Sequence, residues 1–308
     1  MLTASDLWFG YDERTPVLRG VSLTVPADGL VGILGPNGSG KTTLLRMLAG
    51  TRRPQRGAVA LDGAPLTGFS RAALARRMAV VPQETQLAFD YTVAEVAMMG
   101  RYPHLGAFEI EGPRDIAVID ESLAATGTLQ LKDRPYATLS GGEKQRVVIA
   151  AALAQIFRLK AEATRAGSQD FRLKAEATRA DSRGFRLQAE VAASYLLLDE
   201  PTASLDLGYQ LEIADLLKRL HAERRAAIVI STHDLTLAAT LCERLVLVRD
   251  GAVLADGLTD DVLTPENLRK AYDVEAEVTR HASGHRLVVP MRRIAAGRPQ
   301  DRATDKHG

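Results

Sequence analysis

The sequence predicts an α/β fold, a parallel sheet whose strands alternate with helices and which is interrupted by a helical insertion. The run "LVGILG" at 30–35 is wholly apolar, ends in glycine and is followed by the helical pattern "KTTLLRMLAG". Strand and helix patterns alternate again between Tyr195 and Val248. Between these two stretches, residues 92–130 have a helical pattern broken by Gly and Pro. Together these observations predict one α/β core with helices inserted into it.

The remaining elements of the first hundred residues follow from alternation and turn residues. Residues 1–30 alternate apolar and polar side chains around turn residues, which predicts antiparallel strands. "GAVALDGAPL" (57–66) and "MAVVPQ" (78–83) predict two further strands, on either side of the helical "SRAALARR" (70–77). The chain therefore begins with predicted strands and short helices, and a longer helical stretch follows at 92–130.

Composition indicates a globular protein and excludes several classes. Of 308 residues, 46% are hydrophobic and 25% charged, enough apolar side chains for a large core. With a net charge of +1, no overall field attracts nucleic acid, and we expect no nucleic-acid partner. The single cysteine, Cys242, excludes an internal disulfide and a cysteine-built metal site.

No segment has the pattern of a membrane span or a leader. The longest apolar run, Val147 to Ala154, is far shorter than the roughly 20 residues that cross a bilayer. The first residues do not show the basic and then apolar pattern of a secretory signal, so we expect none. If the protein works at a membrane, other subunits must cross it.

A 14-residue repeat does not fit the α/β scheme. Copies begin at Phe157, Phe171 and Phe185, the first two nearly identical and the third decayed. Each copy is rich in helix formers but too short for a stable helix without packing, and its alternating apolar residues also permit a strand. The near-verbatim copying indicates a repetitive DNA element read in frame and tolerated at the surface. The alternative, a basic docking arm, depends on eight basic against five acidic residues, which is a small margin.

Residues 35–42 read G-x-x-x-x-G-K-T, the phosphate-binding loop, at the junction of a predicted strand and helix. Backbone N–H groups of such a loop close around the β- and γ-phosphates, and the helix directs its positive end at them. Lys41 adds a charge at the terminal phosphates, and the Thr42 hydroxyl can ligate Mg²⁺. The flanking elements disfavour a chance glycine-rich turn. The residues predicted to bind the nucleotide are Gly35, Pro36, Asn37, Gly38, Ser39, Gly40, Lys41, Thr42 and Thr43.

Two adjacent carboxylates, Asp199 and Glu200, end the apolar run "YLLLDE". At the end of a buried strand they are unfavourable unless a cation or a water chain uses them. Asp199 is predicted to hold Mg²⁺ through water, and Glu200 to orient the attacking water as a general base. A lone Asp-Glu pair would more often be a solvated strand end, but the phosphate loop in the same chain favours the catalytic interpretation.

A second anion-receptive helix start lies in "LSGGEKQR" at 139–146, which we call the signature segment. Ser140, Gly141 and Gly142 begin a helix there, and the N-terminus of a helix attracts anions. One chain therefore carries two phosphate-binding helix ends.

The order of the phosphate loop, the signature segment and "YLLLDEPTASLD" (195–206) resembles that of the ATPase subunit of ABC transporters, over nearly the whole chain. The resemblance implies a RecA-like phosphate-loop core with an N-terminal antiparallel β subdomain and an inserted helical signature subdomain. The implied units are a core at 1–85 and 195–256, the helical subdomain at 86–155, the repeat insertion at 156–194, a C-terminal extension at 257–292 and a disordered tail at 293–308.

The resemblance also implies roles for four further residues. Gln83 is the Q-loop residue beside Mg²⁺ and the attacking water, His233 contacts the γ-phosphate, and Tyr11 stacks on adenine. Asp206 belongs to the D-loop, which communicates across a dimer interface. Taken alone, each has a plain structural explanation, such as a polar strand end, a structural hydrogen bonder or a hairpin aromatic. The implied Mg²⁺ set is Thr42, Gln83 and Asp199.

In this family two subunits pair head to tail, and the signature segment of one closes over the ATP held by the other. ATP closes the dimer, and hydrolysis releases it. Within each subunit, the signature helix begins at the nucleotide and the strand before Asp199 ends there. Both attachment points of the repeat are therefore expected at the pole opposite the chemistry, where a long insertion is tolerated.

Residues 91–106 and 247–278 resemble importers of iron–siderophore complexes, haem and cobalamin. In these importers the region after the Q-loop grips a coupling helix of the membrane permease. Six residues are candidates for that surface, although ordinary helix packing explains the apolar ones equally well: Val93, Val96, Met98, Met99, Tyr102 and His104.

The resemblance implies an ATP-hydrolysing importer subunit that uses ATP and Mg²⁺. Its partners would be a second copy of itself, a separate permease and, through the permease, a substrate-binding protein. Its place would be peripheral, at the cytoplasmic face of the bacterial inner membrane. Two alternatives stay open: a soluble ABC ATPase without a permease, which the single phosphate loop disfavours, and a subunit inactivated by the repeat, which the intact Lys41, Ser140, Glu200 and His233 disfavour.

Overall fold

A six-stranded sheet forms the centre of the computed structural model, which describes residues 1–12, 14–85, 88–156, 193–203, 205–224, 226–282 and 284–294. Five strands run parallel and β10 pairs antiparallel at the edge, in the order β10-β9-β3-β8-β7-β6. This confirms the predicted parallel α/β core. The strands are β3 (Leu30–Leu34), β6 (Met78–Val81), β7 (Tyr195–Asp199), β8 (Ala227–Thr232), β9 (Arg244–Arg249) and β10 (Ala252–Leu258).

Both faces of this sheet are buried, and alternate residues of each strand enter different cores. In β3, Leu30 and Leu34 pack with the helices on one side, whereas Val31 and Ile33 pack toward the other side. β7 divides in the same way, because successive side chains of a strand point to opposite faces. A strand buried on both faces reads as a continuous apolar run, as "YLLLD" does.

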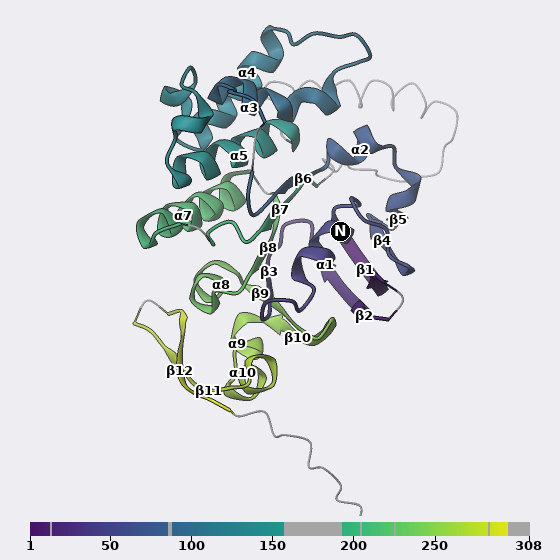
Figure 1. Cartoon of the computed structure of the whole chain (residues 1–308), viewed down its shortest axis with the longest axis vertical. Helices are drawn as coiled ribbons and strands as arrows, with labels where there is room; N and C mark the ends of the chain where they lie inside the picture. Colours follow the sequence, from purple (N-terminus) through teal and green to yellow (C-terminus); the bar gives the residue numbers. More distant parts are fainter. Residues whose placement is uncertain are drawn as a thin grey trace, which may run out of the picture.

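On one face, α1 (Lys41–Leu48) packs between the central sheet and a second, antiparallel sheet (Figure 1). The predicted antiparallel pairing of the first thirty residues is confirmed, with Leu2 opposite Val25. This sheet has the order β2-β1-β4-β5 and contains β1 (Leu2–Gly10), β2 (Pro16–Val25), β4 (Arg56–Leu61) and β5 (Ala64–Pro65). Along the chain, the 3-10 helix η1 (Leu66–Gly68) and α2 (Arg71–Ala75) connect β5 to β6.

A group of helices stands at the top of Figure 1, around α5. Its first helix begins at a capping box in which Thr92 and Glu95 satisfy each other's backbone N–H groups. Val93 and Val96 are 0% and 3% exposed, so they are core residues and cannot form a partner surface; Tyr102 is 59% exposed. The members are α3 (Val93–Met98), η2 (Met99–His104), α4 (Pro113–Ala125), η3 (Leu129–Leu131), η4 (Tyr136–Thr138) and α5 (Gly141–Ile156).

Side chains cap the carboxyl end of α5, where the repeat begins. Arg101 donates to the carbonyl of Ala154 at 2.8 Å, and the Ser194 hydroxyl donates to that of Ile156 at 3.3 Å. The two ends of the insertion therefore meet beside the start of β7. Residues 157–192 of the insertion, with the open choice between helix and strand, lie outside the described residues.

The last part of the chain covers the lower end of the molecule in Figure 1. β12 extends to Arg293, and the backbone N–H of Ile294 donates to the carbonyl of Asp273, so the ordered chain continues past the tail boundary expected at 293. The rest of that expected tail, 295–308, lies outside the described residues. The elements after β7 include α7 (Leu207–Arg224), α8 (Leu235–Leu241), α9 (Thr259–Val262), α10 (Pro265–Tyr272), β11 (Val274–Arg280) and β12 (Arg286–Arg293).

Within the described residues, every helix is either too short or too polar to serve as a bilayer-spanning segment.

Candidate nucleotide-binding site

The phosphate loop connects β3 to α1 and is packed too tightly for a side chain at its first position. A Cβ added to Gly35 would lie 2.2 Å from the carbonyl oxygen of Val248 and 2.6 Å from the Ser39 hydroxyl. The Ser39 Oγ is buried and has no hydrogen-bond partner among the described residues. A buried hydroxyl without a partner is unfavourable, so the loop fits a ligand with acceptor oxygens, as a phosphate has.

Lys41 holds its charge inside this loop. Its side chain is 5% exposed, and Nζ donates to the carbonyls of Gly35 at 2.9 Å and Pro36 at 3.2 Å. The same nitrogen lies 3.5 Å from Glu200 Oε1. The ammonium group therefore lies within the phosphate loop, where it could form a largely buried ion pair with the terminal phosphates of a bound nucleotide.

Asp199 ends β7 with its carboxylate buried among hydroxyl groups. It is 7% exposed, and Oδ1 accepts hydrogen bonds from Thr42 Oγ1 at 3.0 Å and Ser231 Oγ at 2.5 Å. Within the described residues, no cationic side chain pairs with it. A buried carboxylate beside a threonine hydroxyl supplies the hard oxygen donors that Mg²⁺ prefers, so Thr42 and Asp199 fit a magnesium site.

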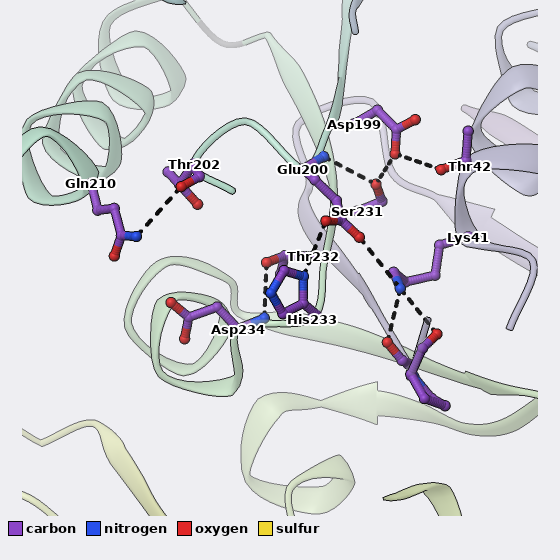
Figure 2. Close-up of polar contacts among 12 residues, drawn as sticks. Lys41, Thr42, Asp199, Glu200, Thr202, Gln210, Ser231, Thr232, His233 and Asp234 are labelled. Atoms are coloured by element: carbon purple, nitrogen blue, oxygen red, sulfur yellow. Dashed lines mark hydrogen bonds and ion pairs between the residues drawn. The ribbon is translucent and has the colours of Figure 1, made fainter. Parts of the chain in front are cut away.

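Glu200 lies between Lys41 and His233, as Figure 2 shows. Its Oε2 is 3.0 Å from Nδ1 of His233, and its backbone N–H donates to the carbonyl of Ser231 at 2.9 Å. The backbone φ of Glu200 is 46°, a left-handed conformation that an L-residue adopts at a free-energy penalty of about 1–2 kcal/mol. An ion pair with Lys41 on one side and a hydrogen bond with His233 on the other hold the carboxylate in place.

Gln83 lies in the loop after β6, on the other side of Glu200. Both residues line a hollow of about 220 Å³, which also touches Gly141 and Lys144 of the signature helix. Among the described contacts, none joins Gln83 to Thr42 or Asp199, so the structure brings it next to the predicted base but not into the predicted magnesium set.

Tyr11 extends over the end of the phosphate loop and is 59% exposed. Its hydroxyl is 3.4 Å from Thr43 Oγ1, and its ring meets Phe9 edge-on with centroids 5.1 Å apart. The hydrogen bond with Thr43 is the main cause that lowers the pKa of Tyr11; burial opposes it, and the charges of Arg46 and Arg52 add to it. The aromatic ring of Tyr11 therefore lies beside the phosphate loop, within reach of a ligand that extends out of it.

The signature segment begins α5 (Gly141–Ile156). Ser140 and Glu143 cap each other's backbone N–H groups, and the hydrogen bond from the Ser140 N–H is the main reason that the pKa of Glu143 is lowered. α5 belongs to the upper helices of Figure 1, whereas α1 lies in the lower half beside the antiparallel sheet. The two helices with anion-receptive N-termini therefore belong to different parts of the fold.

Asp206, the predicted D-loop residue, is exposed, and its Oδ1 accepts a hydrogen bond from the backbone N–H of Tyr209 at 3.1 Å.

Sequence reasoning missed two residues of this region. Ser231 holds both Asp199 and Glu200, and the only signal was a polar pair at the end of the apolar "AIVIST" run. Tyr209, in the first turn of α7, contacts the signature segment and had no sequence signal.

Three features define an ATP-binding subunit of the ABC transporter class. The phosphate loop follows a central strand of the parallel sheet, and the carboxylate pair ends the next strand but one. An inserted helical unit adds a second helix with a capped N-terminus. Residues 18–159 match the family model described as ABC transporter. The hemin import ATP-binding protein HmuV of Gloeobacter violaceus is 40% identical over 279 residues, 89% of each chain. The chain therefore belongs to the ABC transporter family.

Other relatives and structures agree on this family. HmuV of Bordetella pertussis is 38% identical over 86% of this chain and 90% of its own length. The cobalamin import ATP-binding protein BtuD of Halobacterium salinarum is 38% identical over 90% of this chain, which spans 60% of that relative's length.

Two solved structures have the same fold. The cbiO1 subunit of Clostridium perfringens, part of the ABC transporter complex cbiONQ, has a TM-score of 0.65 at 27% identity and covers 87% of this chain and 92% of its own. An inward-facing ABC transporter described as metal-chelate type has a TM-score of 0.72 over 94% and 97%, at 23% identity. These matches confirm the predicted fold class.

Proposed function

We propose that this chain hydrolyses ATP to power uptake of haem, cobalamin or an iron–siderophore complex through a separate membrane permease. The observation that carries the proposal is the position of Glu200, whose carboxylate lies between Lys41 and His233 at the end of β7. It stands beside a phosphate loop in which the buried Ser39 hydroxyl has no hydrogen-bond partner among the described residues. The relatives named for hemin and cobalamin import support the class of cargo.

In the proposed reaction, bound ATP supplies the phosphoryl group and Mg²⁺ the neutralising charge. Lys41 and the loop N–H groups would bind the terminal phosphates, and Thr42 and Asp199 would hold the metal ion. Gln83, which lines the hollow beside Glu200, would have to approach them to complete the predicted metal set. Glu200 accepts a hydrogen bond from the attacking water and takes its proton. His233 restrains the Glu200 carboxylate and reaches the γ-phosphate.

The nucleotide-binding set remains as the sequence predicts it. The loop residues from Gly35 to Thr43 surround the phosphates, and Tyr11 stacks on the adenine. Ser140, Gly141 and Gly142 complete the site of a second copy of this chain, with Asp206 at the interface. The placement of α5 among the upper helices and of α1 beside the antiparallel sheet supports this head-to-tail pairing, because the two helices belong to different parts of one chain's fold (Figure 1).

The remaining partners follow from this class. The helical unit at 86–155 would contact the permease, with Tyr102 exposed for that contact, and a substrate-binding protein would act through the permease. The subunit would lie peripherally at the cytoplasmic face of the bacterial inner membrane. The core at 1–85 and 195–256 and the extension at 257–292 complete the proposed division of the chain.

Gentle detergent extraction of the tagged chain from its native host tests the proposal. A multi-span permease recovered in equal amount, with ATP hydrolysis by the purified complex, is the expected result. Active enzyme recovered only from the soluble fraction would instead support a permease-free ABC ATPase. A complex that binds ATP without turnover would identify a subunit inactivated by its repeat.

A further inference from the structure

One tyrosine of α7 contacts both the D-loop and the signature segment. The backbone N–H of Tyr209 donates to Asp206 Oδ1 at 3.1 Å, which fixes the residue in the first turn of α7. The ring of the same residue packs on Gly142: a Cβ added to that glycine would lie 2.2 Å from Cδ1 of Tyr209. The absence of a side chain at 142 is therefore what allows the ring to lie against the start of α5.

The hydroxyl of Tyr209 reaches the serine of the signature segment. Ser140 Oγ donates to it at 3.4 Å and accepts a hydrogen bond from the N–H of Glu143 at 3.3 Å. These two contacts together orient the Ser140 side chain. Because 3.4 Å is long for a hydrogen bond between hydroxyls, the packing of the ring on Gly142 contributes more to this arrangement than the hydroxyl does.

A second pair joins the same two helices one turn further along. Arg146 of α5 forms an ion pair with Glu212 of α7, and its guanidinium lies 6.0 Å from the centroid of the Tyr209 ring. Four contacts therefore connect the starts of α5 and α7, and Tyr209 takes part in three of them, with Ser140, Gly142 and Arg146.

We propose that Tyr209 is a positioning residue that sets the signature segment relative to the D-loop, so that movement of Asp206 is transmitted to Ser140. This inference rests on the proposed function, because it assumes that Ser140 and Gly142 contact nucleotide held by a second copy. Tyr209 itself touches no nucleotide. Its backbone N–H bonds to the D-loop and its ring packs on the signature segment. The residue thus links two segments that would both meet the partner, and a closely packed link of low compressibility transmits displacement.

The first test compares Tyr209→Ala and Tyr209→Phe in the full-length chain. Tyr209→Ala removes the packed ring, and we expect kcat for ATP hydrolysis to fall about tenfold or more, because small misplacements of contacts beside a reacting group have effects of this size. Tyr209→Phe keeps the ring, and we expect kcat within about threefold of wild type. The Kd for ATP of the single subunit, measured with a fluorescent analogue in EDTA, should stay within about twofold in both variants.

The second test asks whether the ring is the reason for the glycine at 142. Gly142→Ala alone should strongly reduce kcat, since the new Cβ meets the Tyr209 ring. In the Tyr209→Ala background the ring is absent, and we expect Gly142→Ala to reduce kcat by a much smaller factor. An equal fold-loss in both backgrounds would overturn the inference, because the glycine would then be required for another reason.

A control substitution and the wild-type rate separate this inference from the function on which it rests. Leu211→Ala alters an exposed side chain two residues along the same helix and should leave kcat unchanged. If the wild-type chain binds ATP without hydrolysing it, the proposed function fails. If wild type hydrolyses ATP and Tyr209→Ala equals it in kcat, the function stands and the positioning role of Tyr209 is refuted.

Discussion

The hydroxyl of Ser194 donates a hydrogen bond to the carbonyl of Ile156 at 3.3 Å, so the first and last residues of the repeat insertion are in contact. Arg77 strengthens this junction with two hydrogen bonds, at 3.2 and 2.9 Å, from its guanidinium to the carbonyl of Ala193. Both ends of the insertion are therefore held by the described part of the chain.

Because the two ends meet, residues 157–192 can be replaced by a four-residue Gly-Ser linker. We expect the shortened protein to keep its ATPase rate and a Tm within a few degrees, since loop-closure entropy changes by only about 0.6 kcal/mol for each doubling of loop length. Thermal melting and steady-state ATP hydrolysis check this expectation. A large loss of Tm would show that the repeat packs on the core.

Glu200→Gln should reduce ATP turnover by at least about a hundredfold, because the amide cannot take the proton of the attacking water. Binding of ATP should persist, and the closed dimer should accumulate on size-exclusion chromatography in ATP and Mg²⁺. Glu223→Gln, on the exposed end of α7, makes the same chemical change away from the site and should hydrolyse ATP at the wild-type rate. Substantial hydrolysis by Glu200→Gln would remove this residue from the role of base.

Tyr11→Ala should raise KM for ATP about tenfold with little change in kcat, because stacking of a base on an aromatic ring contributes about 1–3 kcal/mol. Tyr11→Phe keeps the ring against Phe9 and loses only the 3.4 Å contact with Thr43. We therefore expect its KM to stay close to the wild-type value. Equal effects of the two substitutions would mean that the hydroxyl, not the ring, binds the nucleotide.

Asp115 and Arg101 form a buried ion pair in the helical unit, with side chains 13% and 6% exposed and Nε 2.9 Å from Oδ1. Burial acts to raise the pKa of Asp115, but the hydrogen bonds from Arg101 and the Gly112 N–H outweigh it and lower that pKa. Since the folded-state pKa lies below the unfolded one, the pair stabilises the protein at neutral pH. Its contribution is lost as pH falls through the lowered pKa.

Asp115→Asn should therefore lower the free energy of unfolding by about 3 kcal/mol at pH 7, because Arg101 is left buried without its partner. The difference from wild type should begin to shrink below about pH 4, where the carboxyl of the unfolded chain takes up a proton, and should vanish only below the lowered folded-state pKa of Asp115. Urea unfolding at several pH values measures both effects. A difference that does not depend on pH would contradict the assignment of charge to this pair.

The sequence by itself determined the sheet core and the order of the chemical motifs. A strand buried on both faces must be apolar at every position, so "LVGIL" and "YLLLD" could be recognised without any knowledge of their neighbours. The phosphate loop and the carboxylate pair are similarly local, because their chemistry requires fixed residue types at fixed spacing.

The tertiary structure alone decided which residues support those motifs. Ser231 became part of the site because β8 pairs with β7, and Tyr209 because α7 packs on α5. Val93 and Val96 proved to be core residues for the same reason, since burial depends on which helices pack against them. Such contacts join residues tens of positions apart, and no local periodicity encodes them: they are fixed only when the layers of the fold come together.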